Sequence, residues 1–159
     1  MKTVDILLAT YNGEKYITEQ IESILNQTYK DFRLLISDDC STDNTRQIIS
    51  EYVKKDKRII VYTQKENIGV VQNFEFLMKK VENDYFMFSD QDDIWKENKI
   101  EIGEKIKKID CICNDFLLKI NSENFNEIYT RIETFYLERF WNLLANRCIY
   151  KKINKDVFV

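Results

Sequence analysis

Four short apolar segments of the sequence are each followed by side chains that could do chemistry. Thr10-Tyr11-Asn12 follows the first, Asp38-Asp39 the second, Asn67-Ile68-Gly69 the third and Asp90-Gln91-Asp92-Asp93 the fourth. Three carboxylates within four residues repel one another unless a cation or solvent relieves the repulsion. Hard divalent ions bind oxygen ligands of this kind. The fourth segment therefore predicts a metal-binding turn.

Each motif also has a plainer structural explanation. A solvated acidic turn that caps a helix at Trp95 would account for Asp90–Asp93, and Asp38 or Asp39 could hydrogen-bond backbone amides in a turn. Tyr11 could be an aromatic at the edge of the core, and Asn67-Ile68-Gly69 a tight turn that needs positive φ. These explanations account poorly for four such groups arriving at one place, so we favour a functional site.

The composition narrows the chemistry. The chain has 159 residues, with 24 basic and 27 acidic side chains, a net charge of −3 and no histidine. This charge argues against bulk electrostatic binding to nucleic acid or anionic lipid. Without histidine, the chain can build neither a Ser-His-Asp triad nor a His-ligated zinc site from its own residues. Acid–base chemistry is left to carboxylates, Lys, Tyr and Cys.

The elements that must position the motifs alternate along residues 1–110. Apolar runs begin roughly 27 residues apart, the spacing of β-α units. Their continuous apolar character is typical of strands covered on both faces, as in a parallel sheet. The runs are Val4–Ala9, Phe32–Ile36, Ile59–Tyr62, Tyr85–Phe88 and Cys111–Leu118. We therefore expect an α/β sandwich with right-handed crossovers.

The stretches between these runs have apolar residues at helical spacing, and Ser41–Asn44 offers N-cap residues for one of them. In an open parallel sheet, ligands bind beyond the carboxyl ends of the strands, so this arrangement would gather the motifs at one edge. A further helix is expected over Glu133–Asn146, after a polar loop at Asn121–Asn126. The expected apolar faces are Tyr16, Ile17, Ile21, Ile24 and Leu25; Ile48, Ile49, Tyr52 and Val53; Val70, Val71, Phe74, Leu77, Met78 and Val81; and, more weakly, Ile102, Ile106 and Ile109.

In their order and spacing, these motifs resemble family 2 of the nucleotide-sugar glycosyltransferases with the GT-A fold. The matching segments are Val4–Gly13, Ile36–Asp43, Asn67–Gly69 and Phe88–Trp95. Ser-Asp-Gln-Asp-Asp-Ile-Trp in the last of them is especially similar to the rhamnosyltransferase-like branch. The resemblance implies a Rossmann-like, nucleotide-binding three-layer sandwich with a mostly parallel central sheet.

The resemblance also implies which residues contact the nucleotide. The loop of Thr10, Tyr11 and Asn12 would contact the base, with Tyr11 packing on it. Asp38 or Asp39 would accept a hydrogen bond from a uracil or thymine ring.

Further roles are implied for the third and fourth motifs. Asn67 and Gly69 would shape the wall of the nucleotide pocket. Asp90 and Asp92 would form the Asp-x-Asp pair, one near the ribose and one on Mn²⁺ or Mg²⁺, and Asp93 would support the turn.

The implied reaction is inverting transfer of a sugar from a UDP- or dTDP-sugar to an acceptor hydroxyl. The metal would act as a Lewis acid on the leaving diphosphate, and a carboxylate base would take the acceptor proton. The expected partners are the nucleotide-sugar donor and a glycan or lipid-linked acceptor of surface polysaccharide synthesis, with no nucleic acid. A cytoplasmic protein is expected, and the basic Lys151–Lys155 segment is compatible with peripheral association at the inner membrane face.

The sequence departs from the family in two places. Residues 1–110 match the donor half, whereas residues 111–159 are expected to be a short remainder of the acceptor half within the same domain. The general base cannot be identified, because Asp115 only matches a polar position of the family, and no motif marks Glu133 or Glu138. Cys40 stands where the family has Gly, and since Cys takes positive φ less cheaply, that loop is expected to differ locally.

Two alternatives belong to other functional classes. The first is a truncated nucleotide-binding remnant, which would bind UDP with metal but transfer no sugar. The second is a receiver-type signalling domain, whose phosphoryl-accepting design needs an acidic pair after the first strand, where this chain has Ala9-Thr10-Tyr11. Activity assays separate the transferase from the remnant, and nucleotide preference excludes the receiver domain.

Overall fold

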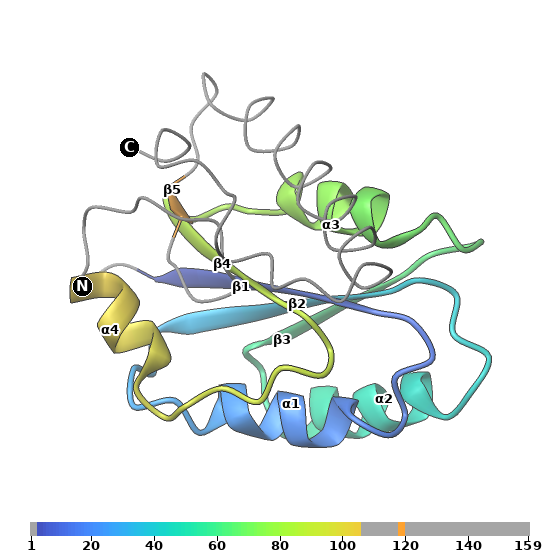
Figure 1. Ribbon diagram of the computed structural model, residues 1–159, viewed down its shortest axis with the longest axis horizontal. Helices are drawn as coiled ribbons and strands as arrows, with labels where there is room; N and C mark the ends of the chain where they lie inside the picture. The colour runs from blue at the N-terminus through green and yellow to red at the C-terminus, as the bar shows by residue number, and fades with distance from the viewer. Residues whose placement is uncertain (1–2, 106–117, 120–159) are drawn as a thin grey trace, which may run out of the picture.

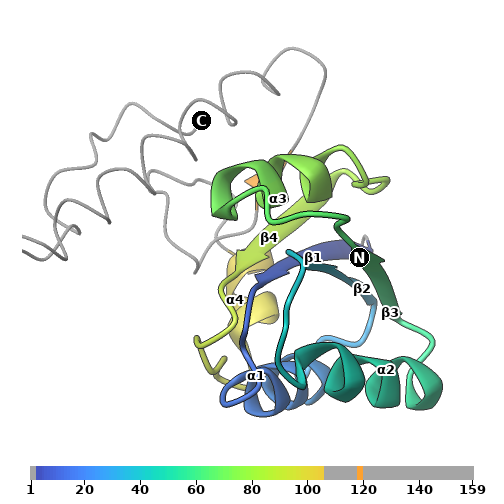
Figure 2. The same cartoon turned by 90° about the vertical axis from the view of Figure 1, so that its right-hand side faces the viewer.

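The computed structural model describes residues 3–105 and 118–119, which form a five-stranded sheet with helices on both faces (Figures 1 and 2). The elements are β1 (Val4–Thr10), α1 (Ile17–Leu25), β2 (Phe32–Asp38), α2 (Thr45–Lys55), β3 (Ile59–Thr63), α3 (Val70–Met78), β4 (Tyr85–Ser89), α4 (Lys99–Lys105) and β5 (Leu118–Lys119). The strand order is β3-β2-β1-β4-β5, in which β5 alone runs antiparallel to its neighbour. The predicted α/β sandwich with a mostly parallel sheet is confirmed.

The strand register brings the carboxyl ends of the four parallel strands to one edge of the sheet. Thr10 at the end of β1 pairs with Asp38 at the end of β2, and Asp38 pairs with Thr63 at the end of β3. On the other side of β1, Leu8 pairs with Ser89 at the end of β4. Three of the motifs begin where one of these strands ends and the remaining one, at Asn67, follows the end of β3 within four residues, so the edge predicted from the sequence exists.

Two apolar cores lie on opposite faces of the sheet, because successive strand side chains point to opposite sides. Ile6 and Leu8 of β1 pack with α1, whereas Leu7 and Ala9 pack with α3. Figure 2 shows α3 on one side of the sheet and α1 and α2 on the other. Both faces of β1 are buried, which explains its continuous apolar sequence.

The helices bury or half-bury most of their predicted apolar residues. Ile17, Ile21 and Ile24 of α1 are fully buried. The exceptions are Tyr16, Val53, Val70 and Ile102, which are 38–51% exposed. Tyr16 precedes α1 and Val70 begins α3, so neither lies over the sheet as the interior of its helix does. Of the face predicted at Ile102, Ile106 and Ile109 only Ile102 is described, and its predicted burial was wrong, because Ile100 is the buried residue at the start of α4.

Several predictions concern residues outside the described part of the chain. Of the predicted Cys111–Leu118 strand only Leu118 is described, and it begins β5, which is antiparallel rather than parallel. The loop at Asn121–Asn126, the helix at Glu133–Asn146 and the basic Lys151–Lys155 segment lie outside it, as do Ile106, Ile109, Asp115, Glu133 and Glu138. Across the residues that are described, no helix has both the length and the apolar character needed to cross a bilayer.

Candidate active site

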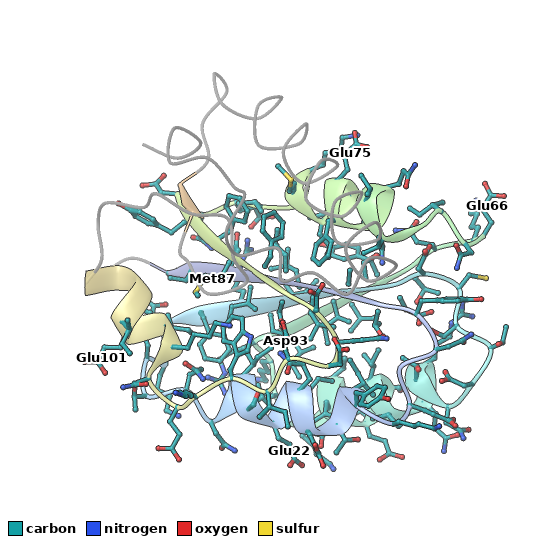
Figure 3. The ribbon with its side chains drawn as sticks, viewed as in Figure 1. Glu22, Glu66, Glu75, Met87, Asp93 and Glu101 are labelled. Carbon is teal, nitrogen blue, oxygen red and sulfur yellow. The ribbon has the colours of Figure 1, made fainter. Side chains whose placement is uncertain are left out.

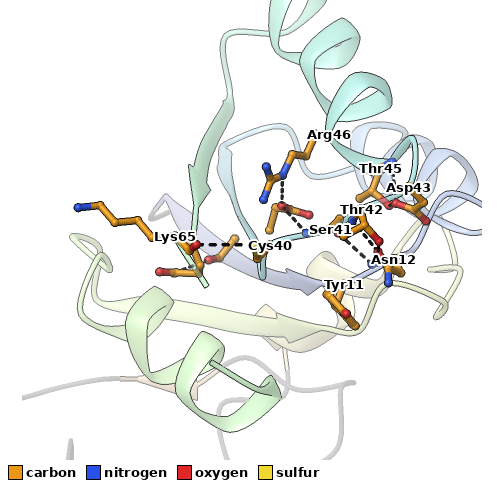
Figure 4. A network of polar contacts seen from close by, with 12 residues as sticks. Tyr11, Asn12, Cys40, Ser41, Thr42, Asp43, Thr45, Arg46 and Lys65 are labelled. Atoms are coloured by element: carbon orange, nitrogen blue, oxygen red, sulfur yellow. Dashed lines mark hydrogen bonds and ion pairs between the residues drawn. The ribbon is translucent and has the colours of Figure 1, made fainter. Parts of the chain in front are cut away.

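The loop after β1 is held by side chains from neighbouring loops. Four successive backbone amides each donate to a side-chain oxygen: Tyr11 N–H to Gln91 Oε1 (3.0 Å), Asn12 N–H to Ser41 Oγ (2.9 Å), Gly13 N–H to Thr45 Oγ1 (2.8 Å) and Glu14 N–H to Asp43 Oδ2 (3.1 Å). Figure 4 shows Asn12 facing Ser41 and Thr42, with the Tyr11 ring beside them. Tyr11 is 45% exposed. An exposed aromatic on a fixed loop can serve as a stacking surface for a ring.

Asp39 joins three loops at the sheet edge. Its backbone N–H donates to the carbonyl of Thr10 at 2.8 Å. Its Oδ1 and Oδ2 accept the amides of Ile68 and Gly69, both at 2.8 Å. Gly69 has φ +84°, a left-handed conformation that favours glycine. The carboxylate therefore fixes the turn that begins α3 against the end of β1, while Asn67 beside it stays exposed.

Asp38 lies in different surroundings from its neighbour. Its Oδ2 accepts Ser41 N–H at 3.1 Å and Arg46 Nε at 2.6 Å, and its Oδ1 is buried with no hydrogen-bond partner in the described chain. The hydrogen bond to Asp38 raises the pKa of the Arg46 guanidinium. Asp38 and Arg46 also line a cavity of about 270 Å³ between α2 and β3. Asp38 thus braces α2, whereas Asp39 braces the loop before α3.

The carboxylates that follow β4 differ in exposure. Asp90 is buried, Asp93 is half-buried and Asp92 is exposed. Figure 3 shows Asp93 on the segment that leads from β4 towards α4. This turn does not cap a helix at Trp95, as the plainer explanation supposed, because α4 begins at Lys99.

No group of three or more His, Cys, Asp or Glu side chains in the described residues is placed to hold a metal ion. A cation at this edge would therefore take one or two protein carboxylates and complete its shell with ligand or water oxygens. That donor set suits Mg²⁺ or Mn²⁺, which is commonly bound through one or two carboxylates together with substrate phosphates. The exposed Asp92 is a fitting donor for such an ion.

Cys40 corrects one prediction. We expected the loop to differ locally because Cys takes positive φ less cheaply than Gly. In the structure Cys40 itself adopts φ +64°, so the loop has the left-handed residue that a glycine would provide. Its Sγ lies 3.8 Å from the carbonyl oxygen of Lys65, a contact drawn in Figure 4.

Two glutamines of this edge were missed by the sequence reasoning. Gln91 accepts hydrogen bonds from Thr10 Oγ1 (2.7 Å) and from Tyr11 N–H. Gln20, fully buried in α1, donates from Nε2 to Ser89 Oγ at 2.7 Å. The sequence could have indicated Gln20, because it is a polar residue one helical turn from both Ile17 and Ile24, within an otherwise apolar helix face. For Gln91 the signal was its place between two aspartates.

The geometry of this edge agrees with the comparison with known families. The profile described as glycosyl transferase family 2 matches residues 5–157. The chain belongs to glycosyl transferase family 2.

Two curated relatives of this family 2 chain are named for their transfer reactions. The dTDP-rhamnosyl transferase RfbG of Shigella flexneri is 46% identical over 110 residues, which are 66% of this chain and 36% of RfbG. The UDP-Glc:alpha-D-GlcNAc-diphosphoundecaprenol beta-1,3-glucosyltransferase WfgD of Escherichia coli is 37% identical over 99 residues, 62% of this chain and 38% of WfgD. The chain thus spans less than two fifths of the length of either relative.

Solved structures give the same fold. S. aureus TarS 1-349 in complex with UDP-GlcNAc has a TM-score of 0.61 and 30% identity, over 65% of this chain and 30% of that one. The mannosyltransferase PcManGT of Pyrobaculum calidifontis, solved with GDP-Man and Mn²⁺, has a TM-score of 0.63 over 69% of this chain and 33% of that one. At 17% identity, the second likeness supports the fold alone. The GT-A fold predicted for the family 2 chain is confirmed.

Proposed function

We propose that this chain carries the donor half of an inverting, metal-dependent glycosyltransferase. It binds a UDP- or dTDP-sugar and transfers the sugar to the hydroxyl of a glycan or lipid-linked acceptor in surface polysaccharide synthesis. Residues 1–110 form the donor-binding half, and residues 111–159 are a short remainder of the acceptor half in the same domain. The protein works in the cytoplasm, at the inner face of the membrane.

The observation that carries this proposal is the set of hydrogen bonds joining the loops at the carboxyl edge of the sheet. Gln91 joins the loop after β1 to the turn after β4, and Asp39 joins the end of β1 to the loop before α3. The loop after β2 contacts the loop after β1 through Ser41, and the start of α2 contacts it through Thr45. Residues that only form turns would hydrogen-bond to the backbone of their own loop. These side chains instead hydrogen-bond to other loops and hold them in one arrangement.

Within that arrangement, Thr10, Tyr11 and Asn12 form the base-contacting loop, and the exposed Tyr11 ring supplies its stacking surface. We favour Asp39 over Asp38 as the carboxylate facing the base, because Asp39 lies between the Thr10 and Gly69 loops while Asp38 is paired with Arg46. Each Asp39 oxygen accepts one amide and keeps a second lone pair for a ring N–H. In this proposal Asn67 and Gly69 form the pocket wall.

Asp92 and Asp90 are the proposed metal-binding residues, with Asp92 the direct ligand because it is exposed and Asp90 facing the ribose. When bound, Mn²⁺ or Mg²⁺ would neutralise the negative charge of the diphosphate. The Mn²⁺ in PcManGT supports a divalent ion in this fold. The residues of the chain itself bind the base, orient the ribose and hold the turn on which the leaving group rests.

The names of the relatives support the donor and acceptor classes. RfbG is named for dTDP-rhamnosyl transfer, and WfgD for transfer from UDP-Glc to a sugar carried on diphosphoundecaprenol. TarS was solved with UDP-GlcNAc. These names favour a pyrimidine nucleotide donor and a lipid-linked or polymeric acceptor. We assign no residue as the general base.

Thermal unfolding of the chain with UDP, dTDP and GDP, each with and without Mn²⁺, tests the donor site. A ligand that binds only the folded state stabilises it by about 2.7 kcal/mol at one hundred times its Kd. We expect the pyrimidine nucleotides to raise Tm in the presence of Mn²⁺, and GDP to do so much less. Asp92→Asn should abolish the Mn²⁺-dependent part of the shift. Glu51→Gln, which removes an exposed carboxylate from α2, is the matched control and should leave it unchanged.

The outcomes separate the proposal from its alternatives. Metal-dependent UDP or dTDP binding with sugar transfer to an acceptor supports the transferase. The same binding without transfer, in the presence of lipid-linked acceptors, would favour the nucleotide-binding remnant. A folded chain whose Tm responds to none of the nucleotides would contradict the donor site altogether.

A further inference from the structure

Gln91 lies at the junction of two loops whose proposed ligands differ. One is the loop of Thr10 and Tyr11, which faces the base, and the other is the carboxylate turn of Asp90 and Asp92. Gln91 Oε1 accepts both the Thr10 hydroxyl, at 2.7 Å, and the Tyr11 amide, at 3.0 Å. Since both partners donate a proton, the side-chain atom at this point must be the amide oxygen. The side chain between the two aspartates therefore points into the base loop.

The carboxylate turn is fastened to α1 on its other side. Gln20 donates to Ser89 Oγ at the end of β4, and Ser23 Oγ accepts the amide of Trp95 at 3.0 Å. Further along, Gln27 Nε2 donates to the carbonyl of Lys96 at 2.7 Å. These contacts hold the chain on either side of the carboxylate turn, at Ser89 and at Trp95–Lys96. The Tyr11 end of the base loop is then the part whose position Gln91 determines.

Gly13 leaves the space that Gln91 needs. A Cβ added at Gly13 would lie 2.4 Å from Gln91 Oε1 and 2.8 Å from Thr10 Oγ1, closer than real Cβ contacts occur. The absence of a side chain at Gly13 therefore allows the approach of Gln91 to the loop. This is a second observation, independent of the hydrogen bonds, that places the Gln91 amide inside the bend of the base loop.

The amides that follow Tyr11 are held from a different direction. Asn12 N–H donates to Ser41, from the loop after β2, and Gly13 N–H donates to Thr45, the first residue of α2. Tyr11 N–H donates to Gln91, from the turn after β4. Loss of Gln91 should therefore release the Tyr11 end of the loop while its Asn12–Gly13 end stays attached. The effect of losing Gln91 should therefore be confined to the Tyr11 amide, which can be measured.

We propose that Gln91 is a positioning residue that holds the Thr10–Tyr11 base loop against the carboxylate turn, so that nucleobase recognition depends on a residue of the Asp-x-Asp motif. The inference rests on the proposed function, because it assumes that this loop contacts the base. Its distinguishing consequence concerns uridine, which has no phosphate and so needs no metal. A residue that served only the metal turn would leave uridine binding unchanged, whereas Gln91 should control it.

The binding arm of the test compares uridine affinity by calorimetry, without metal, in the wild type and in variants. Gln91→Ala should weaken uridine binding about tenfold, as expected for the loss of two hydrogen bonds that preorganise the loop. Gln91→Glu presents an acceptor oxygen at the same distance and should restore the affinity. Gln47→Ala, which shortens an exposed glutamine of α2, is the matched control and should bind as the wild type does. Equal uridine affinity in Gln91→Ala and wild type would overturn the proposal.

A ligand-free arm follows amide hydrogen exchange by NMR. In Gln91→Ala we expect the Tyr11 amide to exchange at least about tenfold faster, because it has lost its acceptor, while Asn12 and Gly13 amides keep their rates. Unchanged exchange at Tyr11 would reject the positioning role. Uniform acceleration at all three would do the same, since it would show general destabilisation. If the wild type binds neither uridine nor UDP with Mn²⁺, the proposed function fails, and this arm still decides whether Gln91 holds the loop.

Gly13→Ala provides a third variant that reaches the same junction from the opposite side. The added Cβ should displace the Gln91 amide and accelerate Tyr11 exchange in the wild-type background. In the Gln91→Ala background the two contacts with Gln91 are gone and only the contact with Thr10 Oγ1 remains, so the additional effect of Gly13→Ala should be smaller, as expected for residues in direct contact. Equal effects in both backgrounds would show that Gly13 and Gln91 act independently, against the proposal.

Discussion

Asp39 uses each of its two carboxylate oxygens for a different backbone amide, which makes it a structural residue as well as a proposed ligand-binding one. The amides of Ile68 and Gly69 are both 2.8 Å away, and the Asp39 side chain is only 2% exposed. An unpaired donor at such a buried place costs more than the hydrogen bond itself contributes. The residue therefore affects stability even without a nucleotide.

We expect Asp39→Asn to lower the free energy of unfolding by about 1–3 kcal/mol. The asparagine side chain has one oxygen and one NH₂ group, so one of the two backbone N–H donors would face the NH₂ group and lose its acceptor. Urea unfolding at neutral pH measures the change. Asp92→Asn is the control, since an exposed side chain in the adjoining turn should change stability by no more than about 0.5 kcal/mol. Identical unfolding midpoints for Asp39→Asn and wild type would mean that these two contacts add nothing.

The sequence predicted where Asp39 and Gly69 lie, but not that they touch. Their position follows from strand periodicity, which places the residues after each strand at one edge. Their contact joins residues 30 positions apart in two irregular loops, whose conformation depends on tertiary packing. The same limit explains why Gln91 was missed, since its partners at Thr10 and Tyr11 are about 80 positions earlier.

At the scale of elements, Asp5 joins β1 to the neighbouring strands at the edge opposite the candidate site. It is fully buried and accepts hydrogen bonds from Arg33 of β2 and from the amides of Glu82 and Asn83, just before β4. Burial alone would raise the pKa of Asp5, but these hydrogen bonds, with one from the Asn83 side chain, together hold that pKa below its ordinary value of 3.8. The charged form is therefore the one that the fold stabilises.

This lowered pKa predicts acid sensitivity with a definite sign. Because the folded pKa of Asp5 lies below 3.8, the unfolded chain takes up its proton first as pH falls. The contribution of Asp5 is complete well above pH 3.8 and is lost as pH falls through the folded pKa.

Asp5→Asn should cost roughly 3 kcal/mol at pH 7, because it leaves Arg33 without its buried partner. The gap between wild type and variant should narrow as pH falls below 3.8, the ordinary value. Urea unfolding from pH 7 to pH 3 measures this gap, with Asp31→Asn, an exposed carboxylate near β2, as the control. A gap that stayed constant over this range would argue against a stabilised Asp5 carboxylate.

For the whole molecule, the two apolar cores share one sheet and should unfold together. Phe74 of α3 is fully buried and meets Phe88 of β4 edge to face, with 5.2 Å between ring centroids. Phe76, two positions later, is half-buried and meets Tyr62 of β3. The contrast separates the core-facing side of α3 from its outer side.

We expect Phe74→Ala to lower the free energy of unfolding by about 3–5 kcal/mol, the usual cost of removing a buried aromatic side chain. Phe76→Ala should cost clearly less. Circular dichroism and the fluorescence of Trp95, measured in a Trp141→Phe background because the chain has a second tryptophan, should report one coincident transition, since Trp95 lies in the core on the opposite face from Phe74. Separate transitions for the two probes would show that the cores fold independently.

The sequence predicted this overall architecture well because its signals are local and repeated. Strand–helix alternation recurs along β1 to β4, and each strand is apolar on both faces. The prediction for α4 was weaker because seven residues give little periodicity, and Ile102 was chosen where Ile100 is buried. The antiparallel direction of β5 could not be predicted, because strand direction depends on how the connecting chain returns to the sheet.

The loop after β1 has a consequence for the electrostatics of any bound anion. Residues 11–14 donate all four of their backbone N–H groups to side chains. Glycine-rich phosphate loops do the opposite and aim a series of amides at the anion. A negatively charged group that binds beside this loop finds its backbone N–H groups already hydrogen-bonded to side chains. This loop therefore adds little amide charge stabilisation, and a ligand that brings its own cation, as a metal-bound diphosphate does, depends least on it.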